Sequence, residues 1–365
     1  MKIVCAKEKL IEGINMVQKA VSTKSTLPIL EGILIEASDK MKLIGNDLEL
    51  AVECFVDAEI FIKGSIVINS KMFGDIIRKM PDTDILLEVQ EGNAVYIECE
   101  NTHFKIKGLS SVGFPSLPTV DKKDEFSIEP KVFKEMIRQT VFAASIDESY
   151  PIFTGMLLEC KNGQLSIVAA DRAARMAFRK SSIMDCGTEF NVVIPARTLN
   201  EISKMIQSNE TLLNICIGTN HIIFSFAQCI VMSRLLEGKY INYKSIMRED
   251  FDTKVVVNNK ALLSSIERAM LISSGDKKHP VIFNIKDGKL DISCNTEFGE
   301  IVDELCIDMD GKEMNIGFNP QYFIESLRTV EDEKVEILFA TNLGPATIKP
   351  LKDDKYAYII GAVRI

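Results

Sequence analysis

The clearest pattern of hydrophobic and polar positions lies between residues 68 and 89. Phe73 and Ile77, with the apolar residues near them, recur at the spacing that places side chains on one face of a helix. Ser70 is positioned to cap the start of this helix, and Pro81 to stop it. An acidic turn and an apolar run follow, so the pattern predicts a short amphipathic helix between two strands.

The same pattern occurs twice more along the chain, over residues 194–217 and 318–339. Leu199 takes the place of Phe73 after 126 residues, and Phe323 follows after a further 124. In the third copy, Asn319-Pro320 is a favourable helix start, with an N-cap followed by proline in the first turn. Three copies at nearly constant spacing predict three structurally equivalent units.

Each unit carries a second helical pattern near its beginning, and alternating runs that predict strands. The expected first helices cover residues 7–21, 130–142 and 260–272. We therefore expect an α+β fold of three repeated domains, each with two helices packed on antiparallel sheets. The expected domains are residues 1–121, 122–250 and 251–365.

Composition narrows the class of protein. The 365 residues are 46% hydrophobic and 26% charged, as in a globular protein. The beginning lacks the apolar core of a signal peptide, and the longest apolar run, 222–232, is too short to cross a bilayer. The nine cysteines form no Cys-x-x-Cys pair. We expect a cytoplasmic protein with reduced cysteines, without a membrane partner or a zinc site.

The sequence offers little support for an enzyme. It contains no phosphate-binding Gly-x-x-x-x-Gly-Lys-Ser/Thr motif, and its three histidines lie in three different units. The densest charged cluster is Asp171, Arg172 and Arg175. Two interpretations of this cluster stay open, a solvated turn with an internal ion pair or a partner-binding site. We expect no catalytic residue, metal or cofactor.

Basic residues on the helices point to a polyanion instead. Lys71 and Arg78 lie two turns apart off the apolar face of their helix, and Arg197, Lys204 and Arg328 recur at equivalent positions. The helical segments hold nearly twice as many Lys and Arg as Asp and Glu, although the formal net charge of the chain is −9. Basic helices on an acidic body predict phosphate contacts that do not depend on base sequence.

Six motifs spread over the whole chain make the interpretation specific. They are Thr26-Leu27-Pro28-Ile29-Leu30, Gly45-Asn46-Asp47-Leu48-Glu49, Gly113-Phe114-Pro115-Ser116-Leu117, Ser233-Arg234-Leu235-Leu236-Glu237-Gly238, Ile316-Gly317-Phe318-Asn319 and Val363-Arg364-Ile365. In order and spacing the chain resembles the β sliding clamp family, the processivity subunit of bacterial DNA polymerase III. The resemblance implies a non-catalytic, head-to-tail dimer that closes a six-domain ring around double-stranded DNA, with helices facing the hole.

The resemblance also implies particular residues and partners. The DNA-binding residues would be Lys24, Lys71, Arg78, Arg138, Arg197, Lys204 and Arg328. The dimer interface would join Phe104 and Ile106 to Leu271 and Ile272 of the neighbouring subunit. The partners would be a clamp loader complex, the catalytic subunit of DNA polymerase III and other clamp-binding replication or repair proteins. A paralogous clamp-like scaffold that serves a repair or mobile-element polymerase is the alternative.

The resemblance further implies a pocket for partner peptides. Its lining would be Phe153, Ala170, Arg175, Met176, Ile241, Ile246, Leu343, Ile360, Gly361, Ala362, Val363 and Arg364. Three segments depart from the family here: Asp171-Arg172-Ala173-Ala174-Arg175-Met176 has an extra residue and no histidine, Tyr240-Ile241-Asn242-Tyr243 replaces Phe-Pro-x-Tyr, and Gly361-Ala362-Val363-Arg364-Ile365 replaces Met-Pro-Met-Arg-Leu. We expect an apolar pocket of altered shape.

Overall fold

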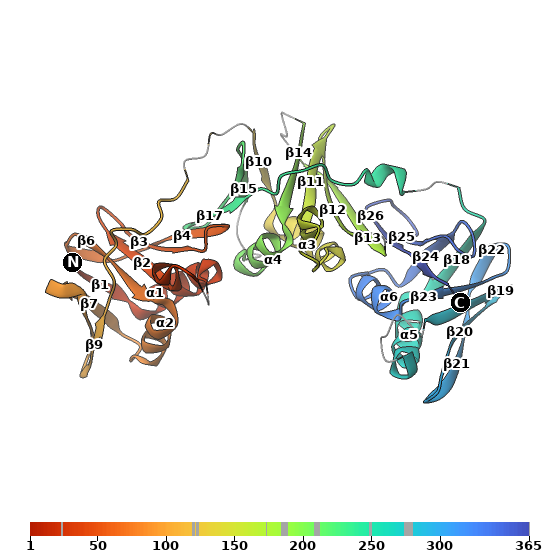
Figure 1. Cartoon of the computed structure of the whole chain (residues 1–365), viewed down its shortest axis with the longest axis horizontal. Helices are drawn as coiled ribbons and strands as arrows, with labels where there is room; N and C mark the ends of the chain where they lie inside the picture. Colours follow the sequence, from red (N-terminus) through yellow and green to blue (C-terminus); the bar gives the residue numbers. More distant parts are fainter. Residues whose placement is uncertain are drawn as a thin grey trace. The chain divides into compact units, whose positions relative to one another are not determined.

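The computed structural model describes residues 1–22, 25–118, 121, 124–172, 174–183, 189–207, 212–247, 250–273 and 280–364. The chain divides into two compact units, and each is described here by itself (Figure 1). Residues 1–130 and 204–235 form the first unit, and residues 131–203 and 236–365 form the second. The division does not follow the sequence repeat, because strands from different repeats share one sheet. The domain boundaries expected after residues 121 and 250 stay a prediction.

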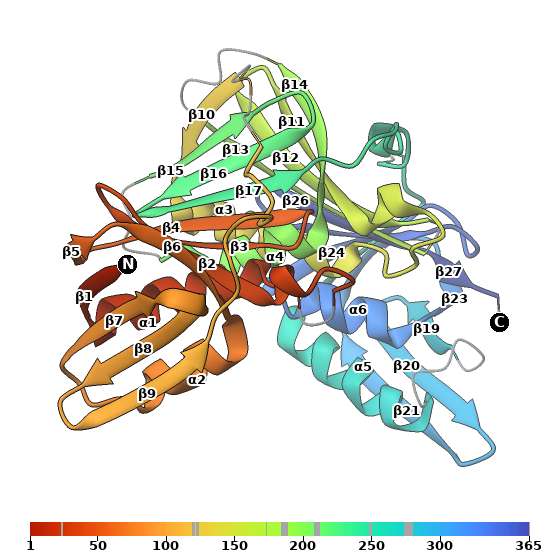
Figure 2. The same ribbon diagram turned by 60° about the vertical axis from the view of Figure 1, so that its left-hand side comes forward.

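Two antiparallel sheets build the first unit. The five-stranded sheet has the order β5 (Glu59–Ile62), β1 (Lys2–Ala6), β7 (Asp84–Gln90), β8 (Ala94–Cys99) and β9 (Thr102–Lys107). The eight-stranded sheet has the order β10 (Asp124–Ile128), β15 (Leu213–Ile217), β16 (His221–Phe226), β17 (Cys229–Arg234), β4 (Leu50–Val56), β3 (Met41–Asn46), β2 (Gly32–Ala37) and β6 (Gly64–Asn69). Within it β17 pairs with β4, which joins the second repeat to the first (Figure 2).

Helices α1 (Lys7–Val17) and α2 (Ser70–Lys79) pack against each other and against the strands of the first repeat. Gly45 on β3 permits this approach, because a Cβ at that position would lie 2.2 Å from the Val17 carbonyl oxygen. Leu10, Ile14 and Phe73 are fully buried, as the helical pattern requires. The burial of such side chains, at roughly 1.5–3 kcal/mol each, holds the two helices on the sheet.

The second unit also has two antiparallel sheets. The nine-stranded sheet has the order β14 (Phe190–Pro195), β11 (Gly155–Lys161), β12 (Gln164–Asp171), β13 (Arg175–Ser182), β26 (Tyr356–Ile360), β25 (Ala346–Pro350), β24 (Lys334–Phe339), β18 (Thr253–Asn258) and β22 (Asp308–Gly311). The five-stranded sheet has the order β21 (Gly299–Cys306), β20 (Lys289–Thr296), β19 (Val281–Lys286), β23 (Met314–Phe318) and β27 (Ala362–Val363). Pairing of β13 with β26 joins the third repeat to the second.

The remaining helices complete the pattern that the sequence predicts. They are α3 (Pro130–Arg138), α4 (Ala196–Met205), α5 (Asn259–Ser273) and α6 (Pro320–Leu327). The predicted cap at Asn319 is confirmed, since its side chain accepts a hydrogen bond from the Gln321 amide at 3.0 Å. The predicted cap at Ser70 is wrong. Asn69 caps α2 instead by accepting from the Met72 amide at 3.0 Å, and Ser70 is already the first helical residue.

Candidate functional site

The two junctions between repeats use equivalent strands. In chain order, β4, β13 and β21 are the third strands after the first helix of their repeats, and β9, β17 and β26 are the third strands after the second helix. The first junction pairs β17 with β4, and the second pairs β26 with β13. The two members of this set that remain, β9 and β21, each form an edge of a five-stranded sheet. The fold therefore leaves one complementary pair of edges for a third junction.

The two edges carry apolar side chains on the face that points to the core. Phe104 and Ile106 on β9 lie opposite the fully buried Ile97 and Val95 of β8, so they share that face. Phe104 is nevertheless 37% exposed, because no strand follows it in the sheet.

On the other edge, Ile301 of β21 lies opposite the buried Cys294 of β20. Leu271 and Ile272 end α5 beside this edge, since a Cβ on Gly299 would lie 3.6 Å from the Cδ1 of Ile272. Leu271 is 81% exposed. The sequence-predicted interface residues thus lie on the two edges that the junction pattern leaves open.

The outer faces of these edges differ in charge. Lys105 and Lys107 of β9 are exposed on one, and Glu300 and Glu304 of β21 on the other. An edge that carries two lysines and an edge that carries two glutamates attract each other, whereas two edges of the same charge repel.

Six of the seven sequence-predicted DNA-binding residues lie within the described parts of the chain, and Lys24 lies outside them. The six are exposed on α2, α3, α4 and the end of α6: Lys71, Arg78, Arg138, Arg197, Lys204 and Arg328. Their side chains therefore reach solvent from helices of all three repeats.

Three of these arginines hold neighbouring acids. Arg78 donates to Asp75 at 3.2 Å and also, at 2.7 Å, to Gln18, which directly follows α1. Arg138 pairs with Glu331 at 2.9 Å, and Arg328 pairs with Glu267 at 2.8 Å. These ion pairs orient the guanidinium groups and offset part of their charge, which a count of basic residues does not reveal.

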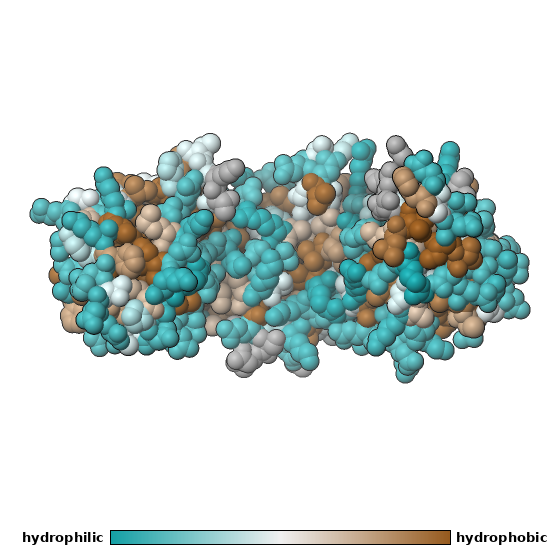
Figure 3. Space-filling model, turned by 90° about the horizontal axis from the view of Figure 1, so that it is seen from below, coloured by the Kyte–Doolittle hydropathy of each residue, from teal (hydrophilic) through white to brown (hydrophobic). Residues whose placement is uncertain are grey.

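An apolar cluster covers one face of strands β11, β12, β13 and β26. Its buried members are Leu157, Val168, Ala170, Met176, Phe178, Val193, Tyr240, Tyr243, Ala357 and Ile359, and the partly buried side chains packed on it are Ile152, Phe153, Leu236, Ile241, Ile246 and Met247. Five residues of the sequence-predicted pocket meet here: Phe153, Ala170, Met176, Ile241 and Ile246. We call the ten buried residues and the six side chains packed on them the apolar cluster. Clusters of hydrophobic side chains also reach the surface on the face drawn in Figure 3, each bordered by hydrophilic residues.

Two tyrosine hydroxyls fix the segment that covers the apolar cluster. The Tyr240 hydroxyl accepts from the Ala170 amide at 3.0 Å and donates to the Gly155 carbonyl at 3.3 Å. The Tyr243 hydroxyl donates to the Glu159 carboxylate at 2.5 Å, and its ring stacks on Phe178 with centroids 5.6 Å apart. Burial of Tyr240 raises the pKa of its hydroxyl, so the donor keeps its proton.

Glu159 is the charged anchor of this covering segment. Burial alone raises the pKa of the Glu159 carboxyl, but hydrogen bonds from Tyr243 and Lys244 outweigh it and lower the pKa overall. Lys244 lies 2.9 Å from the carboxylate. Sequence reasoning did not include the two tyrosines in the pocket. The aromatic residues in Tyr240-Ile241-Asn242-Tyr243 were the signal that could have found them.

The charged cluster at the end of β12 is a turn with an internal ion pair. The Asp171 carboxylate accepts from the Ala174 amide at 2.9 Å and lies 3.4 Å from the Nε of Arg175. The Arg175 guanidinium also pairs with Glu325 of α6 and lies 4.7 Å from the Tyr322 ring centroid. Arg175 therefore bridges the second and third repeats, and its role toward a partner stays a prediction.

The C-terminal residues of the predicted pocket divide between two sheets. Ile360 is fully buried opposite Arg175, and the Gly361 amide donates to the Ala174 carbonyl at 2.8 Å. Ala362 and Val363 form β27, which pairs with β23. Leu343 is 70% exposed between β24 and β25, and Arg364 is exposed. None of these residues belongs to the apolar cluster, although the backbone of Gly361 directly adjoins its strands.

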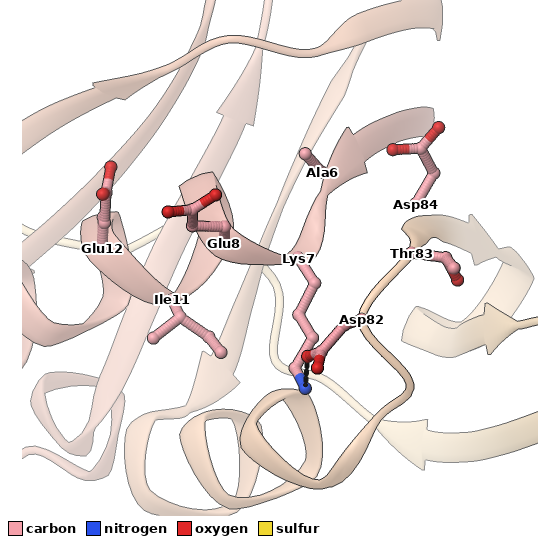
Figure 4. A pocket seen from close by; sticks show the side chains of 8 residues that line it. All are labelled: Ala6, Lys7, Glu8, Ile11, Glu12, Asp82, Thr83 and Asp84. Carbon is pink, nitrogen blue, oxygen red and sulfur yellow. Dashed lines mark hydrogen bonds and ion pairs between the residues drawn. The ribbon is translucent and has the colours of Figure 1, made fainter.

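Among the hollows on the described surface of the first unit, two adjoin helix α1. One of about 470 Å³ lies between the start of α1 and the loop before β7 (Figure 4). Lys7 closes it by donating to the Met80 carbonyl at 2.5 Å and to Asp82 at 2.6 Å, which caps the end of α2. The other, of about 510 Å³, is lined by α1, β4 and the turn between β16 and β17.

Within the described residues, no group of three or more His, Cys, Asp or Glu side chains is arranged to hold a metal ion. No helix in these parts of the chain is long and apolar enough to cross a membrane.

Comparison with known proteins assigns these features to one family. Three family models of the DNA polymerase III beta subunit match the chain: the N-terminal domain over residues 1–118, the central domain over 127–242 and the C-terminal domain over 244–364.

Curated relatives agree with these models. Beta sliding clamps of Halalkalibacterium halodurans and Bacillus subtilis are each 33% identical to the chain, over the full length of both proteins. Solved clamps are similar in fold. The sliding clamp of Bacillus subtilis has a TM-score of 0.96 at 32% identity, and it covers 100% of this chain and 99% of that one. The beta chain of Streptococcus pneumoniae has a TM-score of 0.96 at 29% identity, with 100% of both chains covered. The chain belongs to the DNA polymerase III beta subunit family, the beta sliding clamps.

Proposed function

We propose that this chain closes a ring around duplex DNA as a head-to-tail homodimer and tethers polymerases to it. As a beta sliding clamp the chain is a non-catalytic DNA sliding clamp of the replication machinery. The ring, the residues that contact DNA and the individual partners are the proposed parts.

The observation that carries the ring is the repeated junction. Two junctions within the chain pair equivalent strands, β17 with β4 and β26 with β13. A third junction of the same kind would pair β9 of one subunit with β21 of the next. Such a contact is heterologous, and a heterologous contact that closes after two copies gives a ring instead of a filament.

The exposed cations support sequence-independent sliding. Lys71, Arg197 and Lys204 are exposed on helices of the first and second repeats, and contacts from such side chains to phosphates carry no base information. The ring has no nucleotide-binding motif of its own. We therefore propose that a separate, ATP-driven clamp loader opens it.

The apolar cluster is the proposed docking site for short peptides of polymerases and other clamp-binding proteins. Its partly buried rim, with Phe153, Ile241 and Ile246, offers apolar contact area to such a peptide. A few buried anchors carry most of the affinity of such a peptide.

A linearisation experiment tests the topological tether. The chain is loaded with its own cell's clamp loader and ATP onto a nicked circular plasmid, and the DNA is isolated by gel filtration. We expect the clamp to elute with the circle and to be lost when a restriction enzyme cuts the circle. A clamp that stays on the cut DNA, or binds linear DNA equally well without the loader, would contradict the proposal.

A further inference from the structure

The sheet that joins the first and second repeats contains a facing pair of cysteines. Cys54 on β4 and Cys229 on β17 are register partners, and their sulfur atoms lie 2.6 Å apart. They are 175 positions apart in the chain. Nothing in the clamp function described above uses them.

The strand register gives this pair the geometry of a cross-strand disulfide. The Phe55 amide donates to the Gln228 carbonyl, so residues 55 and 228 form a hydrogen-bonded pair. Cys54 and Cys229 are the next pair along the ladder and therefore a non-hydrogen-bonded one, in which the Cα atoms approach to about 4.5 Å. Disulfides span Cα separations of roughly 4.4–6.8 Å. A bond between the two sulfurs needs no change of register.

The sulfurs also adjoin a hollow that a small molecule can enter. Both cysteines line the hollow of about 510 Å³, together with Lys9, Met16 and Phe226. Pockets that bind small molecules have volumes of roughly 300–1,000 Å³, and this hollow falls within that range. A hydrogen bond from the Cys229 thiol lowers the pKa of Cys54, against the opposing effects of burial and the Glu12 carboxylate. The nucleophilic thiolate is therefore favoured at Cys54.

We propose that Cys54 and Cys229 are a reversible oxidation site, at which a low-molecular-weight disulfide such as oxidised glutathione links the N-terminal and central domains covalently. The Cys54 thiolate attacks one sulfur of the small disulfide, which forms a mixed disulfide and releases one thiolate. The Cys229 thiol then loses its proton and attacks the Cys54 sulfur, which releases the second small thiol. The two cysteines lose two protons and two electrons, and one small disulfide becomes two thiols.

The test uses the full-length chain and peptide mapping. After incubation with millimolar oxidised glutathione, remaining thiols are alkylated in denaturant and the chain is cut with trypsin without reduction. Cys54 lies in peptide 43–63, and Cys216 and Cys229 lie in peptide 205–234. We expect these two peptides to be joined. The mass of the joined peptide should be lower than the sum of the two by two hydrogen atoms, and dithiothreitol should separate it into its two parts.

Cys216 supplies the matched control. It lies on β15 of the same sheet and in the same tryptic peptide, and it is as buried as the pair, with all three residues 5% exposed. Cys216→Ser should leave the link unchanged, whereas Cys54→Ser or Cys229→Ser should abolish it. Oxidation should also raise the melting temperature of the chain, by roughly 5–10 °C, because it closes a very long loop.

Two results would overturn the proposal. One is recovery of both cysteines as alkylated or singly glutathionylated residues in the wild-type chain, without the joined peptide. The other is a joined peptide that survives Cys229→Ser and is lost in Cys216→Ser, which would assign the link to Cys216.

Discussion

Truncation of the two apolar residues at the end of α5 should dissociate the proposed ring. The variant is Leu271→Ala with Ile272→Ala. Leu271 is 81% exposed in the single chain, so its contribution belongs mainly to association, whereas Ile272 already contacts the start of β21. Leucine or isoleucine to alanine costs about 2–5 kcal/mol at a fully buried site. For the pair we take about 2–4 kcal/mol of lost association energy per contact, because part of the Ile272 packing survives in the monomer.

Closure doubles this effect. A head-to-tail dimer has two copies of the contact, and separation into monomers breaks both. The loss is then about 4–8 kcal/mol, which raises the dissociation constant about 10³- to 10⁶-fold, at about 1.4 kcal/mol per tenfold change. Opening of one contact, as a loader would require, is eased by only half of that energy.

Sedimentation velocity over a range of concentrations measures the change. We expect a dimer for the wild-type chain and a monomer for the variant at low micromolar concentration, with unchanged circular dichroism. Ile146→Ala is the control, since Ile146 is 97% exposed in the loop before β11 and belongs to neither edge strand. A double variant whose dissociation constant stays within tenfold of the wild-type value would refute the assignment of this interface.

Three further predictions concern the charged edges, the helices and the apolar cluster. Lys105→Glu with Lys107→Glu should weaken the dimer, and adding Glu300→Lys with Glu304→Lys to the same chain should restore it. Sedimentation at low and high salt measures both effects, and failure of the second pair to restore the dimer would argue against β9–β21 pairing. The triple variant Lys71→Glu, Arg197→Glu and Lys204→Glu should stay on circular duplex DNA for a shorter time than the wild-type chain. The loss should be equal for all base sequences and smaller in high salt, and a sequence-dependent loss in a filter-retention assay would speak against phosphate contacts. Gly361→Met with Ala362→Pro should strengthen the binding of a typical clamp-binding peptide by about 1 kcal/mol, roughly fivefold. Isothermal titration measures the two affinities, and equal values would show that these positions do not form the pocket floor.

The threefold repeat is the part of the fold that the sequence predicts best. Hydrophobic periodicity and constant spacing identify the six helices, because each helix must bury one face on its own sheet. The cap of α2 was misassigned to Ser70 because Ser and Asn both cap well and neighbouring positions compete. Backbone geometry, which periodicity does not fix to one residue, decides between Asn69 and Ser70.

The candidate site depends on contacts between residues distant in the chain, and these are harder to predict. Nothing near Arg78 in sequence shows that Gln18, just after α1, will accept its hydrogen bond. The same holds for Tyr240 and Ala170, which meet because the segment after β17 crosses the face of β12. The charges along the helices indicated a basic face, and the family resemblance implied an apolar pocket, but only tertiary packing shows which side chains are already engaged.

The three junctions of the proposed ring differ in a way that suits their roles. β26 reads Tyr-Ala-Tyr-Ile-Ile, and β17 is uncharged until Arg234, so each junction within the chain has one strand of apolar or neutral side chains. The strands that they pair with carry few charges at the seam, Glu53 on β4 and Arg175 and Arg179 on β13. β9 carries a lysine or histidine at every second position, and β21 carries a glutamate at two of the four positions of its exposed face. An apolar seam cannot be exposed without a large cost, whereas charged outer faces remain solvated when they separate. We therefore expect a loader to open the proposed junction between subunits while the two junctions within each chain stay closed.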